Sequence, residues 1–355
     1  MILPGDAPES IAAAAGCIRA GGLLGLPTET VYGLAADADN DAAVAQIFVA
    51  KGRPPDHPLI VHVASSEAVA HYAIDVPDFA TQLMAAFWPG PLTLILPRRP
   101  GVATAAAGGN PTIGLRCPAH PVAQKLLNWG QIPINPTFDS ETSKQLESDP
   151  NYFWGLAAPS ANQFGRVSPT TAAHVQGEFG DDLLVLDGGP CTVGIESTII
   201  DCTRGAPVLL RPGAVTPAQI QASCGIRVLL NKELLAQTIK GPKASGTLES
   251  HYAPRARVRL LDAPALQVEL NKLQDQNEGD STSPLVAVWS RTALAVPAAQ
   301  VIHQTMPSDA AAVAQQLFAT LRAFDVRGVS QIWVETPPAT PQWDGVRDRL
   351  QRAAH

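Results

Sequence analysis

The sequence predicts an α/β protein with two domains, the larger on a mixed sheet and the smaller on a second α/β unit. Three observations lead to this prediction. Short apolar runs typical of strands are interleaved with segments of helical spacing without strict alternation, which favours a sheet that is not purely parallel. The run Lys240-Gly241-Pro242-Lys243-Ala244-Ser245-Gly246 offers little for a core and indicates a linker over 231–254. With 355 residues, the chain is long enough for a core on each side of it.

The first domain, predicted over 1–230, contains helices and strands with recognisable end signals. Val44, Ile47 and Phe48 have helical spacing, and residues 39–41 supply N-cap candidates for their helix. Trp88-Pro89-Gly90-Pro91 cannot continue the helix before it. Helices are predicted over 9–20, 42–51, 77–87 and 120–129. Strands joined by turns are predicted over 22–27, 59–63, 92–97, 112–116, 183–186, 197–201 and 208–211.

The second domain, predicted over 255–355, has the strand and helix order of a small Rossmann-like unit. It lacks a G-x-G-x-x-G run, so the sequence assigns it no dinucleotide. Its strands are predicted over 258–261, 285–289 and 332–335, and its helices over 266–273, 309–324 and 343–353.

Composition limits the function classes. Hydrophobic residues make up 46% and charged residues 16%, which is ordinary for a globular protein. Every apolar run is cut by Pro, Gly or a charge, and the first residues lack a basic n-region, so neither a membrane span nor a secretory signal is expected. Five widely spaced cysteines without C-x-x-C favour reduced thiols in a cytoplasm. A net charge of −7 disfavours a protein whose main task is gripping a nucleic-acid backbone.

Two short polar motifs point to an anionic ligand. Lys51 and Arg53 flank Gly52, and Ser160 and Asn162 follow an apolar run about 110 residues later. In an extended segment, side chains at i and i+2 point the same way, so we expect each pair to face one ligand. Two cations with two neutral hydrogen-bonding groups suit a nucleotide phosphate or a carboxylate.

These motifs are accompanied by others in a fixed order. The further motifs are Pro27-Thr28-Glu29-Thr30-Val31-Tyr32-Gly33-Leu34, Asp56-His57-Pro58-Leu59-Ile60-Val61-His62-Val63, Thr112-Ile113-Gly114-Leu115-Arg116-Cys117-Pro118, Gly194-Ile195-Glu196-Ser197-Thr198 and Leu210-Arg211-Pro212-Gly213. Together they resemble the YrdC-like L-threonylcarbamoyl-AMP synthases in their longer, two-domain form. The resemblance covers roughly residues 10–215 and resumes over 245–254. It implies the twisted mixed sheet of the YrdC-like fold, with a concave face that carries the site.

The resemblance implies a reaction and a set of site residues. L-threonine, bicarbonate or CO2, and ATP would give threonylcarbamoyl-AMP and pyrophosphate, and the product would pass to the machinery that makes threonylcarbamoyladenosine in tRNA. Lys51 and Arg53 would be catalytic. Threonine would be bound by Thr30, His62, Arg116, Ser197 and Thr198. ATP would be bound by Lys51, Arg53, His57, Thr112, Ser160, Asn162, Ser168, Arg211 and Tyr252.

No cluster of Asp, His or Cys has metal-ligand spacing, and no P-loop motif is present. We therefore expect no metal site in the protein, with Mg²⁺ carried by the ATP phosphates. No membrane partner is expected, and direct nucleic-acid binding is possible but not required.

Several residues also have ordinary structural interpretations. His62 fits a core histidine, Arg116 fits a partner of a structural carboxylate, and Arg211 fits a surface turn. The segment 131–154, which departs from the family pattern, fits either a tolerated surface insertion anchored by its aromatic residues or a lid. Residues 231–254 fit a linker that folds over the active site, with Tyr252 reaching the nucleotide, or one that merely packs the domains together.

Two other functions remain open from the sequence. One is a module that binds double-stranded RNA or tRNA without turnover, which would need cations spread along a groove. The other is a carbamoyl transferase that consumes carbamoyl-phosphate.

Overall fold

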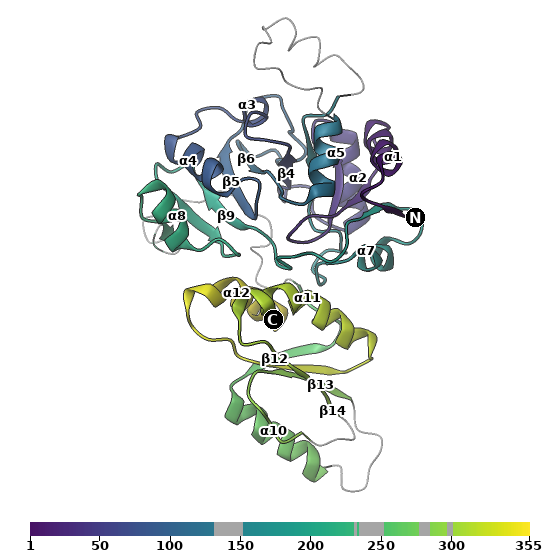
Figure 1. The fold of residues 1–355 in the computed structure, drawn as a ribbon, viewed down its shortest axis with the longest axis vertical. Coiled ribbons are helices and arrows are strands. Elements are labelled where there is room, and N and C mark those ends of the chain that lie inside the picture. The colour runs from purple at the N-terminus through teal and green to yellow at the C-terminus, as the bar shows by residue number, and fades with distance from the viewer. Residues whose placement is uncertain (131–151, 231–232, 234–251, 277–284, 297–300) are drawn as a thin grey trace, which may run out of the picture. The chain divides into compact units, whose positions relative to one another are not determined.

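The chain divides into two compact units, which the computed structural model describes over residues 1–130, 152–230, 233, 252–276, 285–296 and 301–355. The first unit comprises Met1–Phe164 and Ser168–Thr247, and the second comprises Gly165–Val167 and Leu248–His355 (Figure 1). Most of the predicted linker and of the predicted insertion lies outside the described residues, so the proposed boundaries at 230 and 254 stay predictions.

The first unit is built on an eleven-stranded sheet in the order β1-β8-β2-β3-β7-β4-β6-β5-β9-β10-β11. Parallel pairs such as β4 with β6 and antiparallel pairs such as β5 with β6 occur in the same sheet, which confirms the predicted mixed sheet. The strands are β1 (Ile2–Pro4), β2 (Leu24–Leu26), β3 (Gly33–Asp37), β4 (Ile60–Val63), β5 (Leu92–Pro97), β6 (Thr112–Arg116), β7 (Gly155–Ala157), β8 (Leu184–Asp187), β9 (Thr198–Asp201), β10 (Val208–Arg211) and β11 (Leu229–Leu230).

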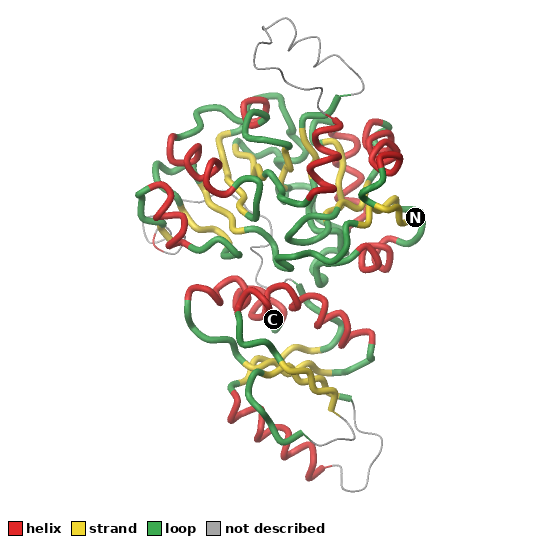
Figure 2. Tube along the Cα trace, in the orientation of Figure 1, coloured by secondary structure: helices red, strands yellow, loops and turns green. Residues whose placement is uncertain are grey.

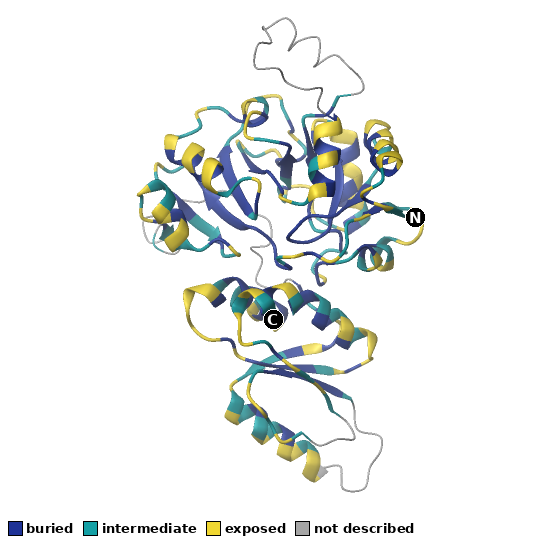
Figure 3. Cartoon of the chain, in the orientation of Figure 1, coloured by how far each residue is buried: buried dark blue, intermediate teal, exposed yellow. Residues whose placement is uncertain are grey.

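Each helix packs an apolar face against this sheet, and the opposite face of the helix is exposed to solvent. Figure 3 shows the central strands largely in the buried colour, while the outer turns of α1, α4 and α8 are exposed. The helices are α1 (Pro8–Arg19), α2 (Asp41–Lys51), α3 (Val69–Tyr72), α4 (Asp78–Phe87), α5 (Pro121–Gly130), α7 (Ala172–Phe179) and α8 (Pro217–Cys224). Among the described residues, no helix is long and apolar enough to cross a membrane.

The end signals of α2 place the residues that follow it. Asn40 is the N-cap and accepts a hydrogen bond from the Ala43 amide, within the range predicted for the cap. The helix ends at Gly52, whose φ of 62° is left-handed. Glycine adopts this conformation without steric cost and is the usual residue at a helix C-terminus.

The second unit has a four-stranded parallel sheet in the order β12-β15-β13-β14. Helices α11 and α12 lie on one face and α10 on the other, which confirms the Rossmann-like arrangement (Figure 2). The elements are β12 (Arg257–Leu261), α10 (Ala263–Gln276), β13 (Val286–Ser290), β14 (Val301–Thr305), α11 (Ala310–Val326), β15 (Gln331–Glu335), the short 3-10 helix η1 (Pro341–Trp343) and α12 (Asp344–Ala353).

Candidate active site

Sheet register brings two predicted threonine-binding residues together. Strand β4 pairs in parallel with β6, and His62 is aligned with Arg116. Aligned residues on neighbouring strands point to the same face of a sheet. Both side chains are almost completely buried, at 3% exposed each. The end of β6 therefore places a guanidinium beside an imidazole inside the first unit.

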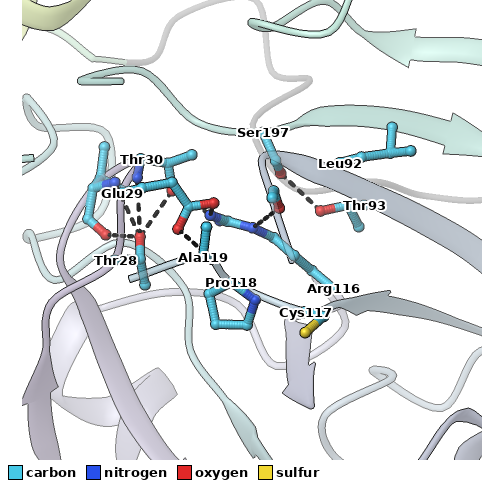
Figure 4. A network of polar contacts seen from close by, with 12 residues as sticks. Thr28, Glu29, Thr30, Leu92, Thr93, Arg116, Cys117, Pro118, Ala119 and Ser197 are labelled. Atoms are coloured by element: carbon cyan, nitrogen blue, oxygen red, sulfur yellow. Dashed lines mark hydrogen bonds and ion pairs between the residues drawn. The ribbon is translucent and has the colours of Figure 1, made fainter. Parts of the chain in front are cut away.

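The Arg116 guanidinium is held by three protein acceptors. Nε donates to the Gly90 carbonyl at 3.1 Å, Nη1 to the Thr30 hydroxyl at 2.8 Å and Nη2 to Glu29 Oε1 at 2.5 Å (Figure 4). The second carboxylate oxygen of Glu29 accepts the Ala119 amide at 3.0 Å. Pairing of Arg116 with a carboxylate was one of the two interpretations left open by the sequence, and the structure identifies that carboxylate as Glu29.

Thr30 reaches Arg116 because Thr28 shapes the turn before it. The Thr28 hydroxyl donates to the Val31 carbonyl at 2.6 Å and lies 2.9 Å from the Thr30 hydroxyl. A threonine hydroxyl bonded to the backbone a few residues on is a common way to fix a turn. The motif at 27–34 thus delivers both Glu29 and Thr30 to one guanidinium.

His62 is neutral in this surrounding. Burial, with a smaller contribution from the positive charge of Arg116, lowers its pKa to about 3. The backbones of Leu156 and Ile60 favour the charged form to a smaller degree, but no group meets hydrogen-bond geometry at the buried Nδ1 atom.

A second polar group gathers around Ser197. Its hydroxyl lies 2.7 Å from the Thr93 hydroxyl and accepts Arg211 Nη2 at 3.1 Å. Arg211 Nε also donates to the Ser197 carbonyl at 3.0 Å, and the arginine is buried at the end of β10. Arg211 is therefore not in a surface turn. Figure 4 shows Ser197 and Thr93 near Arg116.

The Thr198 hydroxyl has a structural role in this state. It donates to the Val215 carbonyl at 2.8 Å and accepts the Val215 amide at 3.1 Å. These bonds hold the segment after β10 against β9. The predicted contact of Thr198 with threonine stays a prediction.

The position of Lys51 differs from the one predicted for the pair Lys51 and Arg53. It is the last residue of α2 and not part of an extended loop, so the i, i+2 argument for Lys51 and Arg53 is wrong. Its Nζ donates to the Ser160 carbonyl at 2.5 Å and to the Asn162 carbonyl. Arg53 instead donates to the Pro58 carbonyl at 3.0 Å.

The same correction applies to Ser160 and Asn162. The Asn162 amide donates to the Ser160 carbonyl at 3.0 Å, which is a tight turn and not an extended segment. Their carbonyls, and not only their side chains, therefore face the lysine. The structure nevertheless joins the two motifs, which lie 109 to 111 residues apart in the chain.

Lys51 is buried, and burial lowers its pKa to about 7. The charge of Arg53 contributes to this lowering, while the charges of Glu178 and Glu196 oppose it. Glu196 in turn accepts the Ser168 hydroxyl at 2.5 Å. Ser168, Glu196 and Lys51 thus belong to one buried charged neighbourhood.

The remaining predicted residues lie at the margins of this region. The His57 ring lies 5.8 Å from the Phe164 ring. Thr112 begins β6 and Arg116 ends it, so about 13 Å of strand separates them. The structure does not place Thr112 with the Arg116 group.

Tyr252 belongs to the second unit. Its ring is 1% exposed, lies 5.3 Å from the Phe318 ring and lies under the Arg349 guanidinium at 5.6 Å. Its φ of 63° is left-handed, which is unusual for a tyrosine. The predicted contact with ATP stays a prediction.

Two aromatic residues at the end of the predicted insertion pack within the first unit. Phe153 is 2% exposed and packs in the core, and the Trp154 ring stacks on His71 at 4.6 Å. The packing of Phe153 and Trp154 agrees with the interpretation of an anchored surface insertion, which stays a prediction. Whether the segment acts as a lid lies outside the described residues.

Sequence reasoning missed Glu29, Thr28 and Thr93 as members of the site. Glu29 and Thr28 lie in the motif at 27–34, next to the predicted Thr30, and this position could have identified them. Thr93 had no such signal, because only pairing of β5 with β9 brings it to Ser197. Within the described residues, no group of three or more His, Cys, Asp or Glu side chains is arranged to hold a metal ion.

Comparison with known proteins assigns the family. The family model described as "Telomere recombination" (Sua5_yciO_yrdC) matches residues 16–213, and that of the threonylcarbamoyl-AMP synthase C-terminal domain matches residues 215–355. Threonylcarbamoyl-AMP synthases from Pyrococcus abyssi and Bacillus subtilis are 36% and 35% identical, covering 96% and 97% of this chain and 93% and 92% of their own.

A solved structure leads to the same assignment. P. abyssi Sua5 complexed with L-threonine superposes with a TM-score of 0.82 at 34% identity, covering 100% of this chain and 97% of that one. The structural similarity extends over both units, including the second, in which the sequence contains few motifs of the family. The chain belongs to the threonylcarbamoyl-AMP synthase family.

Proposed function

We propose that threonylcarbamoyl-AMP is made on the buried polar groups of the first unit, from L-threonine, bicarbonate or CO2, and ATP. The observation that carries this proposal is the convergence of Arg116, His62 and Thr30 at one end of β4 and β6. These side chains offer a guanidinium for a carboxylate and neutral hydrogen-bonding groups for a hydroxyl. The relative from P. abyssi was solved with L-threonine, which supports threonine as the amino acid.

Arg116 would bind the threonine carboxylate, with His62, Thr30 and Ser197 around the rest of the amino acid. Because Glu29 and Gly90 already accept from two of its nitrogens, the guanidinium is fixed before the substrate arrives. A preorganised group loses little freedom on binding and is therefore effective in orienting a ligand. Thr198 would contribute only if its bonds to Val215 were exchanged.

Lys51, Arg53 and Arg211 would face the triphosphate. The carbamate oxygen of the carbamoylated threonine attacks the α-phosphorus, the bond from that phosphorus to the bridging oxygen breaks, and pyrophosphate leaves. Such a transfer needs alignment and positive charge where the leaving group gains negative charge. Ser160, Asn162 and Ser168, together with His57 and Thr112, would hydrogen-bond the phosphates, ribose or carbamate.

Mg²⁺ would arrive with ATP. The described residues contain no group of three or more His, Cys, Asp or Glu side chains that could hold a metal ion, so we assign no residue of this chain to Mg²⁺. The ion would neutralise charge on the leaving pyrophosphate, with water as its main ligand. We place the reaction in the cytoplasm, since all five cysteines lie in the described part of the chain as free thiols. The product would then be consumed in the threonylcarbamoylation of tRNA.

The test is release of pyrophosphate from ATP by the full chain. We expect release that depends on both L-threonine and bicarbonate, each omitted in turn. Equal release without threonine would contradict the proposal. A parallel assay with carbamoyl-phosphate in place of ATP and bicarbonate should give no product.

A further inference from the structure

We propose that Glu29 sets the charge of the amino acid that the Arg116 group accepts, so that a net-neutral zwitterion binds and a simple carboxylate does not. This inference rests on the proposed function of that group. It names a specificity-determining residue to which neither the sequence motifs nor the family comparison gives a role.

The first argument is that Glu29 and Arg116 form a buried, direct ion pair. Glu29 Oε1 and Arg116 Nη2 are 2.5 Å apart, and the side chains are 7% and 4% exposed. A buried charge without a partner is strongly unfavourable, and an arginine alone here would demand an anion. With Glu29 present, the charge of Arg116 is already balanced.

The second argument is that, among the residues that the structure describes, no other charged side chain forms a hydrogen bond or an ion pair with Glu29 or Arg116. His62, aligned with Arg116, is held neutral by burial and by the arginine itself. Burial raises the pKa of the nearby Cys191 thiol to about 12, and the effects of Glu29 and Arg116 on it have opposite signs. The local charge of the group is therefore zero.

The third argument concerns the guanidinium donors. An arginine has five N–H groups, and one on each nitrogen of Arg116 is already donated to Gly90, Thr30 or Glu29. The two that remain lie on Nη1 and Nη2, where an incoming carboxylate comes close to Glu29. A ligand that is only an anion would suffer this repulsion, whereas the ammonium of an amino acid offsets it.

The experiment compares two ligands by calorimetry on the full chain: L-threonine and its deaminated analogue, 2,3-dihydroxybutanoate, in which a hydroxyl replaces the amine. In the wild type we expect threonine to bind about tenfold or more tightly. In Glu29→Gln, which removes the negative charge but keeps the shape, that ratio should fall by about tenfold or more.

A matched control is Asp201→Asn. Asp201 forms another buried ion pair in the first unit, with Arg204 at 2.6 Å. The substitution changes the net charge by the same amount, but away from Arg116, so the ratio of the two affinities should stay as in the wild type. A ratio in Glu29→Gln that matches the wild type and Asp201→Asn would overturn the inference.

If Glu29→Gln does not fold, ligand binding to the wild-type protein still tests the inference. Threoninamide carries an ammonium but no carboxylate, so it and the deaminated analogue have opposite net charges. A balanced site should bind both more weakly than threonine. An anionic analogue that binds as tightly as threonine would refute the role of Glu29 while leaving the proposed function intact, whereas a wild type that binds none of the three refutes both.

Discussion

At the residue scale, three buried basic groups of the first unit are accommodated in three different ways. The charge of Arg116 is balanced by that of Glu29, which lies beside it. His62 gives up its charge, since burial and Arg116 both disfavour the imidazolium. Lys51 is directed at two backbone carbonyls, while burial lowers its pKa to about 7. In each case, a bound charged substrate would change the electrostatic environment of the basic group.

Substitution of two arginines should separate the two substrates. Arg116→Ala should weaken threonine binding far more than ATP binding, and Arg53→Ala should weaken ATP binding. Loss of one partner of a buried charge pair typically costs about 2–5 kcal/mol, or tens- to thousands-fold in affinity. Calorimetry with each substrate measures this, with a thermal melt as control because Glu29 loses its partner. Arg116→Ala with normal threonine affinity would show the assignment of Arg116 to be mistaken.

Because of Lys51, the free energy of unfolding should depend on pH in the alkaline range. Between about pH 7 and the unfolded value near 10.5, the unfolded chain keeps a proton that the folded chain has lost. The free energy of unfolding should therefore rise with pH in this window, by at most about 1.4 kcal/mol per pH unit from this group. Urea unfolding at pH 7, 8 and 9 measures the slope. Lys51→Met should remove this contribution, and identical slopes for both proteins would rule it out.

At the scale of elements, helix ends and turns place the site residues. Gly52 reverses the chain after α2, so that Lys51 stays inside while the following residues leave the helix. The turn at Thr28 and the ends of β6 and β10 similarly position Thr30, Arg116 and Arg211. Regular elements supply rigidity, and their ends supply the functional groups.

Two glycine substitutions should have opposite effects on stability. Gly52→Ala puts a Cβ on a left-handed residue with a φ of 62°, which costs about 1–2 kcal/mol. Gly177→Ala lies in α7 with open space around the added Cβ, and should stabilise the protein by about 0.5–1 kcal/mol. Urea unfolding of both variants compares them under the same conditions. Stabilisation by Gly52→Ala would mean that the left-handed turn is not maintained in solution.

At the scale of the whole molecule, the chain carries two compact units, and family membership extends over both. The described polar groups proposed for threonine lie in the first unit. The second contributes Tyr252, the one predicted ATP-binding residue outside the first unit among those the structure describes. Its ring packs against Phe318 and Arg349.

Substitution of Tyr252 tests whether the second unit takes part in the reaction. Tyr252→Phe keeps the ring and its packing, so the melting temperature should change little, while turnover should fall if the hydroxyl contacts the nucleotide. A chain truncated after about residue 235 should keep a folded first unit with poor pyrophosphate release. Full activity of the truncated chain would show that Tyr252 and the second unit are dispensable.

The α/β class, the family and most of the longer elements could be predicted from the sequence alone. The strands predicted over 92–97, 112–116 and 208–211 are confirmed with the same bounds, because each is an apolar run closed by Pro or a charge. The two-residue β11 and the three-residue β1 were not predicted, since they are strands only through pairing with β10 and β8. Strands β3, β7 and β14 were also missed.

Which side chains neighbour one another depends on how the elements are arranged in space. Glu29 and Arg116 are 87 residues apart, and Lys51 lies 109 and 111 residues from the carbonyls it contacts. Local spacing wrongly predicted that Lys51 and Arg53 share one extended segment, because a helix end and a left-handed glycine separate them. Sequence patterns report which face a residue prefers within its own element, whereas the order and register of the strands in the sheet fix its partners.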